Sequence, residues 1–365
     1  MADRILSINP GATSTKLAYF ENDEMILSKE LTYSYDDIAK YDSIMDQYDF
    51  RFREITMWLT EQNMTNGSFD AVVGRGGLLP PVNAGAYIVD DAMIDCLKHR
   101  PVLQHASNLG ATLAKGVAQA FGTLDCKAYI YDPVTVDQMD DVARISGVAD
   151  IERKSIGHVL NMRAVCMKIA EEKLQKPYEE SNLIVAHVGG GSSASVHKNG
   201  RMIDLVSDDE GLFSTERSGG LPLKEVIPLC FERTKKEMTD LTRKKGGLVS
   251  YFGTNDARIV EEKAKNGDEK AKLVLEAMAY QIAKTIGELA TVLYGKVDGI
   301  IMTGGLAYSE FITSLVKDRT SFIAPVFFVP GEAEMVALAK GARRVLVGQE
   351  KAQVFKEHDR KAIVV

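Results

Sequence analysis

Residues 5–33 read ILSINPGATSTKLAYFENDEMILSKELTY, and this stretch decides the fold because residues 183–207, LIVAHVGGGSSASVHKNGRMIDLVS, repeat its plan. Each stretch begins with an apolar strand, passes through a loop of Gly, Ser and Thr, and adds two strands joined by a tight polar turn. A small-residue loop between two strands can direct backbone N–H groups and hydroxyls at a phosphate. The repetition therefore predicts a duplicated nucleotide-binding core.

Composition restricts the class of protein. The chain has 365 residues, 45% hydrophobic and 26% charged, which is typical of a globular protein with two domains. Its net charge of −7 argues against a nucleic-acid partner. Its apolar runs are shorter than the roughly 20 residues that a membrane span needs, and its four scattered cysteines indicate a reducing compartment. We therefore expect a cytoplasmic protein with neither nucleic acid nor membrane as a partner.

Strands and helices alternate in both halves, which predicts an α/β protein with mixed sheets. Ser107 is the expected N-cap of one helix. We expect helices over residues 50–64, 90–98, 108–121, 158–175, 270–294 and 332–347, and further strands over 69–73, 127–131, 298–302 and 324–329. The expected first lobe comprises residues 1–155 plus 331–365, and the second lobe residues 156–330.

Three glycine-rich segments are candidate nucleotide contacts. Asn9–Lys16, taken alone, fits a plain turn as well as a phosphate loop, but its similarity to Gly189–Ser193 favours the phosphate loop. Residues 189–194 match GxGxxA, yet the residues that follow continue as a strand, whereas a Rossmann fingerprint opens a helix. Thr303-Gly304-Gly305 follows a buried strand, where glycine lets the backbone approach a flat adenine or ribose. The alternative there is a simple strand-to-helix turn.

The order of these segments carries a resemblance to a known superfamily. A phosphate loop, an acid at a strand end (Asp132), a second phosphate loop and a Gly-Gly pair follow one another as in the actin, sugar kinase and Hsp70 superfamily. The resemblance implies a two-domain, duplicated actin-like ATPase fold, related to ribonuclease H, with an ATP cleft between the lobes.

Further segments narrow the resemblance. From Arg4 to about Gly348 the chain resembles the butyrate kinases, which are carboxylate kinases for short or branched acids in the acetate kinase family. The resemblance implies reversible, in-line transfer of the γ-phosphoryl group of ATP to a carboxylate, giving an acyl phosphate and ADP. The segments that carry it are LQHASN (103–108), IGHV (156–159), HVGGGSS (187–193), DDEGLFSTERSGGLP (208–222) and VPGEAEMVALA (329–339).

The resemblance also implies a role for each matching residue. Arg217 is the expected clamp on the transferring phosphoryl group, because a guanidinium presents a fixed fork of donors, and His158 donates to the same oxygens. Asp132 and Asn9 complete the catalytic set, and His105 and Arg75 bind the acyl substrate. Mg²⁺ accompanies ATP or ADP and is held by Asp132 and by Glu334 or Glu332. The nucleotide is expected to contact Gly11, Thr13, Ser14, Lys16, His187, Gly189, Gly190, Gly191, Ser192, Gly304 and Gly305.

Two positions depart from the acetate kinase pattern. Those enzymes carry an arginine three residues before His-Gly-Gly, whereas here Val72 takes the arginine position and Arg75 takes that of the histidine. The charge therefore comes from a different backbone position, which favours the butyrate branch. The second departure is Glu332-Ala333-Glu334, where the relatives have adjacent glutamates. The helix that follows favours Glu334 as the metal-side residue and leaves Glu332 open.

The expected partners are ATP and a short-chain fatty acid, either butyrate or a branched analogue, in a homodimer or higher homo-oligomer. One alternative is an acetate or propionate kinase. A second is a sugar or polyol kinase, in which Asp132 acts as general base on a hydroxyl. A third is an ATP-driven switch without an acceptor substrate.

Overall fold

The computed structural model describes residues 2–357, and these divide into two compact units. The first unit takes the described residues up to Asp137 and again from Ala333; the second runs from Gln138 to Glu332. Residues 138–155, which the sequence-based bounds place in the first lobe, pack in the second unit, where Arg153 binds Asp204 at 3.1 Å. Residue 1 and residues 358–365, expected in the first lobe, lie outside the described residues. The assignment of functions to the two lobes stays a prediction.

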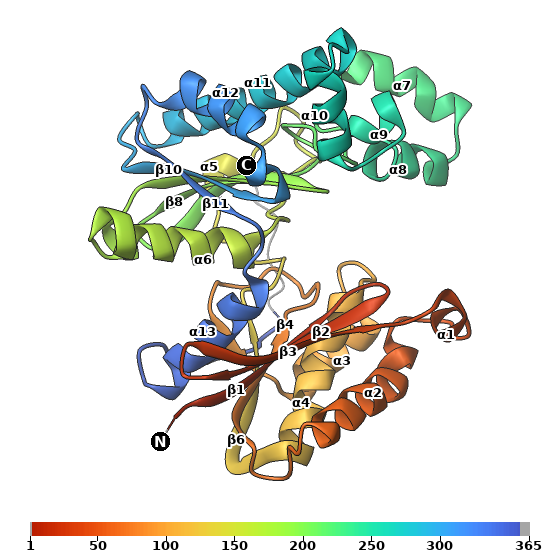
Figure 1. Ribbon diagram of the computed structural model, residues 1–365, viewed down its shortest axis with the longest axis vertical. Helices are drawn as coiled ribbons and strands as arrows, with labels where there is room; N and C mark the ends of the chain where they lie inside the picture. The colour runs from red at the N-terminus through yellow and green to blue at the C-terminus, as the bar shows by residue number, and fades with distance from the viewer. Residues whose placement is uncertain (1, 358–365) are drawn as a thin grey trace. The chain divides into compact units, whose positions relative to one another are not determined.

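The first unit is built on a seven-stranded sheet in the order β12-β5-β6-β4-β1-β2-β3 (Figure 1). β1 pairs in parallel with β4, and β4 with β6, while β2 and β3 add antiparallel neighbours on the other side of β1. The strands are β1 (Arg4–Pro10), β2 (Ser14–Glu21), β3 (Glu24–Thr32), β4 (Phe69–Arg75), β5 (Ala86–Ile88), β6 (Gly122–Tyr131) and β12 (Gln353–Val354).

The second unit repeats this arrangement in a five-stranded sheet, ordered β11-β10-β7-β8-β9. β7 pairs in parallel with β10, and β10 with β11, while β8 and β9 extend the other side in antiparallel pairing. The predicted duplication is therefore confirmed strand by strand, and each small-residue loop joins the first two strands of its unit. The strands are β7 (Leu183–Val188), β8 (Ser192–Lys198), β9 (Arg201–Val206), β10 (Gly299–Gly304) and β11 (Val326–Pro330).

Helices cover both faces of the first sheet, with α13 on one face and α2, α3 and α4 on the other (Figure 1). α4 approaches β4 closely because glycines face each other: a Cβ added to Gly74 would lie 2.1 Å from the carbonyl oxygen of Gly110. The helices of this unit are α1 (Tyr35–Ala39), α2 (Tyr48–Glu61), α3 (Asp91–His99), α4 (Leu109–Phe121) and α13 (Glu334–Leu346).

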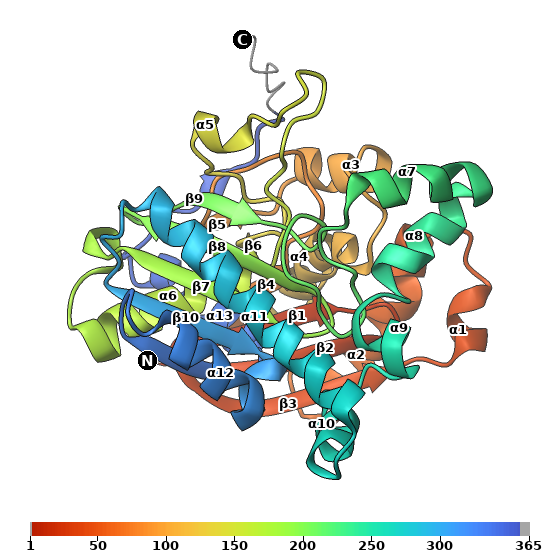
Figure 2. The ribbon, with the colours of Figure 1, turned by 90° about the horizontal axis from the view of Figure 1, so that it is seen from above.

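In the second unit α11 crosses one face of the sheet beside α12 (Figure 2), and α6 covers the other face. Aliphatic side chains of α11 and of strands β7, β8 and β10 form one continuous buried core, in which Ile184, Met278 and Ile300 are fully buried. The helices are α5 (Asp141–Arg144), α6 (Val159–Ile169), α7 (Leu223–Glu232), α8 (Lys235–Arg243), α9 (Gly247–Phe252), α10 (Ala257–Lys265), α11 (Glu269–Val292) and α12 (Glu310–Thr320). Among residues 2–357 no helix is both long enough and apolar enough to cross a bilayer.

Three local predictions need correction. Ser107 does not cap α4; it lies in a short 3-10 turn, Ala106–Asn108, and its amide N–H donates to His105 Nδ1 at 3.2 Å. The helix expected over residues 158–175 changes character, because α6 ends at Ile169 and Ala170–Leu174 forms a π-turn. The strand expected over 127–131 also begins earlier, at Gly122.

Candidate functional site

The loop between β7 and β8 is a tight turn of three glycines. The amide of Gly189 donates to the carbonyl of Gly191 at 3.0 Å, and the Ser214 hydroxyl donates to the carbonyl of Gly190 at 2.6 Å. Ser192, which follows, is fully buried, and its hydroxyl makes no hydrogen bond within the described part of the chain. Glycine keeps this loop open to a ligand, since the side chains of His158, Glu216 and Arg217 already lie beside it.

Two predicted catalytic residues meet at Gly191. A Cβ added there would lie 3.5 Å from His158 Cε1 and 3.7 Å from Arg217 Nε. His158 is oriented by a 3.0 Å hydrogen bond between its Nδ1 and the Ser193 hydroxyl. Its ring stacks on that of His187, with centroids 3.9 Å apart and planes at 7°. The structure therefore brings His158, His187 and Arg217 to one loop, as the sequence predicts.

The guanidinium of Arg217 is held by Asp208 and by the backbone of Arg243. Its Nε donates to Asp208 Oδ2 at 3.1 Å, and its Nη1 donates to the carbonyl of Arg243. Its side chain is three-quarters buried, so its position is fixed by packing as well as by charge. A restrained guanidinium beside a glycine loop suits a phosphoryl group, because its donors need little reorganisation.

His187 is oriented by a buried polar chain. Its ring is 1% exposed, and its Nδ1 accepts from the Asn161 amide at 3.1 Å, which also donates to the Thr303 hydroxyl at 3.1 Å. This assigns the ring proton to Nε2, and the Nε2 atom lies 3.1 Å from Glu332 Oε1. Asn161 was not identified from the sequence, although its position one helical turn after His158 is a signal. Thr303 belongs to the segment Thr303-Gly304-Gly305, which the sequence marks as a candidate nucleotide contact.

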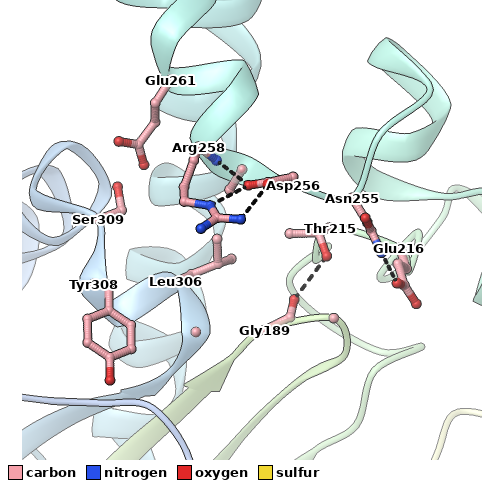
Figure 3. A pocket seen from close by; sticks show the side chains of 13 residues that line it. Gly189, Thr215, Glu216, Asn255, Asp256, Arg258, Glu261, Leu306, Tyr308 and Ser309 are labelled. Atoms are coloured by element: carbon pink, nitrogen blue, oxygen red, sulfur yellow. Dashed lines mark hydrogen bonds and ion pairs between the residues drawn. The ribbon is translucent and has the colours of Figure 1, made fainter.

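A cavity of about 680 Å³ opens beside the same loop (Figure 3). This lies within the range of roughly 300–1,000 Å³ that is usual for small-molecule sites. Gly305 lines it and faces open space, whereas a Cβ on Gly304 would lie 2.4 Å from the carbonyl of Val188. Glycine at position 304 thus allows a positive φ and close contact with the backbone of Val188. Gly305 instead leaves space at the wall of the cavity.

The opposite wall comes from residues that the sequence analysis missed. Asn255 donates to Glu216 Oε1 at 2.6 Å, and Arg258 forms an ion pair with Asp256 at 2.6 Å (Figure 3). Their signal was the N-cap Asp256, which starts α10 at the cavity. Carboxylates, an amide and a guanidinium around a partly apolar cavity supply the donors and acceptors that a nucleoside needs. The remaining lining residues are Gly189, Gly190, Thr215, Ala257, Glu261, Leu306, Tyr308 and Ser309.

In the first unit, the corresponding loop lies between β1 and β2. The amide of Gly11 donates to the carbonyl of Ser14 at 2.8 Å, and the Ser14 hydroxyl donates to Glu30 at 2.9 Å. Asn9 and Lys16 pair across the two strands, and Thr13 and Lys16 are exposed. This loop therefore presents backbone and small side chains to solvent at the same topological position as the loop of the second unit.

Three predicted residues of the first unit contact one another. Asn9 Nδ2 donates to Glu334 Oε2 at 2.6 Å, and Arg75 Nη1 forms an ion pair with Glu334 Oε1. Glu334 begins α13, which is anchored to β1 by the Ser7 hydroxyl donating to the carbonyl of Met335. Arg75 thus shares its charge with Glu334, while the other open candidate, Glu332, lies beside His187 in the second unit.

His105 and Asp132 are held by their own neighbourhoods in the first unit. His105 Nδ1 lies 2.8 Å from the Ser107 hydroxyl, and partial burial, assisted by the positive charge of Arg75, lowers the pKa of its imidazole. Asp132 is buried at the end of β6 with φ of +39°, and its Oδ1 accepts from the amide of Gly85 at 2.7 Å. A buried aspartate with left-handed backbone is unusual and is found at functional sites.

The structure gathers the predicted residues into two groups, one in each unit. No three His, Cys, Asp or Glu side chains of residues 2–357 form a cluster that could hold a metal by themselves. Mg²⁺ is commonly bound through one or two carboxylates together with substrate phosphates and waters, and Glu334 or Asp132 suits that mode.

Comparison with known proteins places the chain among kinases of carboxylic acids. Residues 158–355 match the model of the acetokinase family. The chain is 48% identical over 360 residues to butyrate kinase 2 of Clostridium acetobutylicum, covering 98% of this chain and 100% of that protein. A probable butyrate kinase of Coprothermobacter proteolyticus is 44% identical over 359 residues, covering 97% and 100%.

Solved structures show the same fold at much lower identity. The acetate kinase of Porphyromonas gingivalis superposes with a TM-score of 0.77 at 18% identity, covering 94% of this chain and 100% of that one. A propionate kinase from Francisella tularensis gives a TM-score of 0.72 at 17% identity, covering 93% and 98%. These likenesses show the duplicated α/β fold and say nothing of which acid is bound.

Proposed function

The chain belongs to the acetokinase family, and on that premise we propose that it transfers the γ-phosphoryl group of ATP reversibly to a short-chain carboxylate, giving an acyl phosphate and ADP. The observation that carries the proposal is the convergence of His158 and Arg217 on Gly191, at the rim of a cavity of nucleoside size. Butyrate or a branched analogue is the proposed acid, since the similar proteins named above are butyrate kinases.

The acceptor explains why donors rather than a base dominate the site. A carboxylic acid with a pKa of about 4 to 5 is already ionised at neutral pH and needs no general base. The requirement is to bring two anions together in line and to stabilise charge on the equatorial oxygens of the phosphoryl group. Arg217 and His158 are proposed to bind those oxygens, and Asn9 and Asp132 to complete the catalytic set. Arg75 and His105 are proposed to hold the acyl substrate.

The nucleotide is proposed to use both glycine-rich loops and the cavity. Gly11, Thr13, Ser14 and Lys16 would bind phosphates in the first unit. His187 and residues 189–192 would do so in the second, and Gly304 and Gly305 would lie against the adenosine. Mg²⁺ would neutralise charge on the phosphates, and Glu334, Asp132 or Glu332 would hold it through waters.

Location and assembly are part of the same proposal. The free thiols of Cys96, Cys126, Cys166 and Cys230 support a reducing, cytoplasmic setting. A homodimer or higher homo-oligomer is supported by α7, which exposes Leu223, Ile227 and Phe231 at helical spacing along one face. Light scattering coupled to gel filtration measures the number of copies.

The test is phosphoryl transfer from Mg-ATP to acids from formate to hexanoate, with branched acids and glycerol included. Hydroxylamine traps any acyl phosphate as a hydroxamate. A hydroxamate maximum at four or five carbons is expected, and a maximum at acetate or propionate moves the chain to those kinases. ADP release with glycerol, or without any acceptor, and no hydroxamate would overturn the proposal in favour of a polyol kinase or an ATPase switch.

A further inference from the structure

Arg51, on the first turn of α2, is a buried cation without a carboxylate partner. Its side chain is completely buried, and among residues 2–357 no Asp or Glu lies within ion-pair distance of it. Burial lowers the pKa of Arg51, but a guanidinium titrates so high that it stays charged. A buried charge of this kind is destabilising by several kcal/mol unless other groups compensate it.

The compensation comes from the loop between β1 and β2. Arg51 Nη1 donates to the carbonyls of Gly11 and Ser14 at 2.8 and 3.1 Å, and Nη2 donates to that of Ala12 at 3.0 Å. Gln47 Oε1 accepts from Nε and Nη2 at 3.0 and 2.8 Å. The Tyr33 ring lies 4.9 Å from the guanidinium carbon, a cation–π contact.

These contacts decide which way the loop presents its amides. In a trans peptide the N–H points away from the carbonyl of the same unit. Because the carbonyls of Gly11 and Ala12 point at Arg51, the N–H groups of Ala12 and Thr13 point away from it. Both residues are exposed, and their N–H groups donate no hydrogen bond within the described part of the chain. Two outward amides backed by a cation form an anion cradle.

We propose that Arg51 is a positioning residue for the nucleotide, which shapes residues 11–15 into a phosphate cradle and places beneath it a positive charge that no carboxylate neutralises within the described part of the chain. The inference rests on the proposed function, which names the anion as the polyphosphate of ATP or ADP. The carbonyl oxygens and the Gln47 amide oxygen carry only partial negative charge, so the group around Arg51 keeps a net positive charge. The phosphate chain supplies the missing negative charge when it binds.

Gln47→Glu separates the charge from the packing. The new carboxylate keeps the shape of the amide and accepts the same two N–H groups, so it pairs with Arg51 and neutralises it. We expect the thermal midpoint to stay equal or rise, while the KM for ATP and the Kd for ADP rise about tenfold. The Kd for adenosine, which has no phosphate, should stay within about twofold, because a distant neutral group feels little of the charge.

Arg51→Met and Arg51→Lys form the second arm. Methionine removes both the donors and the charge and should weaken ADP binding at least as much as Gln47→Glu; lysine should restore part of it because it keeps the charge. The matched control is Arg53→Met, the same exchange on the same helix at a side chain that is 64% exposed. Arg53→Met should bind ADP as the unmodified chain does.

The outcomes separate this inference from the proposed function. If the unmodified chain forms hydroxamate but Gln47→Glu keeps its KM for ATP and its Kd for ADP, Arg51 is structural and the inference is overturned alone. Equal losses of ADP and adenosine affinity in folded Gln47→Glu overturn it as well, since a charge beneath the phosphates cannot act on adenosine. If the unmodified chain binds no ADP and forms no hydroxamate, the proposed function itself fails.

Discussion

Because Gly191 has no side chain, two catalytic candidates can approach its backbone. His158 and Arg217 come from distant parts of the sequence, yet both lie within 4 Å of the place where a Cβ of residue 191 would stand. The stacking of His158 on His187 and the pairing of Arg217 with Asp208 hold both groups before any ligand arrives. Preorganisation of this kind is what lowers the barrier to phosphoryl transfer.

Arg217→Ala should therefore reduce kcat by about 100- to 1,000-fold, because it removes the donors that we propose stabilise the transferring group. The KM for ATP should change much less. The measurement is steady-state hydroxamate formation with the best acid. Arg243→Ala is the matched control, since it removes a second arginine from Asp208 but keeps the carbonyl that Arg217 Nη1 contacts. A kcat that falls equally in both variants would show that Asp208, not Arg217, governs the site.

Glu334→Gln and Glu332→Gln decide which glutamate serves the metal. Glu334 contacts Asn9 and Arg75, whereas Glu332 lies beside His187. We expect Glu334→Gln to raise the Mg²⁺ concentration for half-maximal activity by roughly tenfold or more, and Glu332→Gln to change it little. Titrating activity with Mg²⁺ at fixed ATP gives both values. The reverse ranking assigns the metal to Glu332.

Residue patterns predicted one part of the site and missed another. His158, His187 and Arg217 were found because each lies in a specific motif, and the structure brings them together. Arg51 was missed because a charged residue on an amphipathic helix usually faces solvent. Only the fold places it beneath the first loop, so no local pattern could identify it.

At the scale of elements, glycines allow the backbones of α4 and β4 to approach each other closely. A Cβ added to Gly110 would lie 2.1 Å from the carbonyl oxygen of Arg75, so the helix and strand backbones are in direct contact. Arg75 ends β4, and its side chain binds the first residue of α13. The close contact between α4 and β4 therefore helps to fix the position of the Arg75 backbone, from which its side chain reaches Glu334.

Gly110→Ala should destabilise the chain by about 2 kcal/mol or more, because the added methyl group forces α4 away from β4. Gly287→Ala is the matched control inside α11, where an added Cβ meets nothing within 4 Å. It should raise stability by up to about 1 kcal/mol through helix propensity alone. Urea unfolding of the two variants gives both changes, and equal effects would mean that the α4–β4 contact can relax.

Element prediction succeeded where periodicity was strong and failed where helices are exposed. The two hairpin repeats and the buried helix α11 were predicted from apolar patterns. The helix α7 was missed because Pro228 lies inside it, and proline usually interrupts a helix. The helix α8 was missed because none of its residues is buried. A local signal existed for α8: Thr234 and Glu237 form a capping box.

At the scale of the molecule, the two units share one strand order but carry different functional side chains. The order β6-β4-β1-β2-β3 in the first unit matches β11-β10-β7-β8-β9 in the second. The first unit carries Asn9, Arg75 and Glu334, while the second carries the histidine pair, Arg217 and the cavity. Sequence similarity between the loops predicted the duplication, but it could not predict this division because side chains outside the loops create it.

The stability of the second unit should depend on pH through His197. This ring is fully buried between Tyr178 and Ser195, at 2.7 and 2.8 Å, and burial lowers the pKa of His197 to about 3. Between that value and the ordinary pKa of 6.5, the unfolded chain binds one proton more than the folded chain, so stability falls as pH decreases. The loss due to this residue should be about 2 kcal/mol at pH 5.

Urea unfolding at pH 5, 6 and 7, followed by circular dichroism, measures that loss. In His197→Gln the difference between pH 7 and pH 5 should shrink by about 2 kcal/mol. His99→Gln, which removes an exposed imidazole, is measured beside it as the control. An unchanged pH dependence in His197→Gln would assign the acid sensitivity to other groups.

The first unit is discontinuous, and this sets the order in which the chain can be completed on the ribosome. Its sheet is begun by residues before Asp137, but α13 packs on that sheet and β12 joins its edge only after all of Gln138–Glu332 has been translated. The second unit is contiguous and can fold as soon as it emerges, since domains generally fold as units during synthesis. Until the last residues are made, Asn9 and Arg75 lack Glu334. A nascent chain can therefore complete the cavity of the second unit before Glu334 is in place beside Asn9 and Arg75.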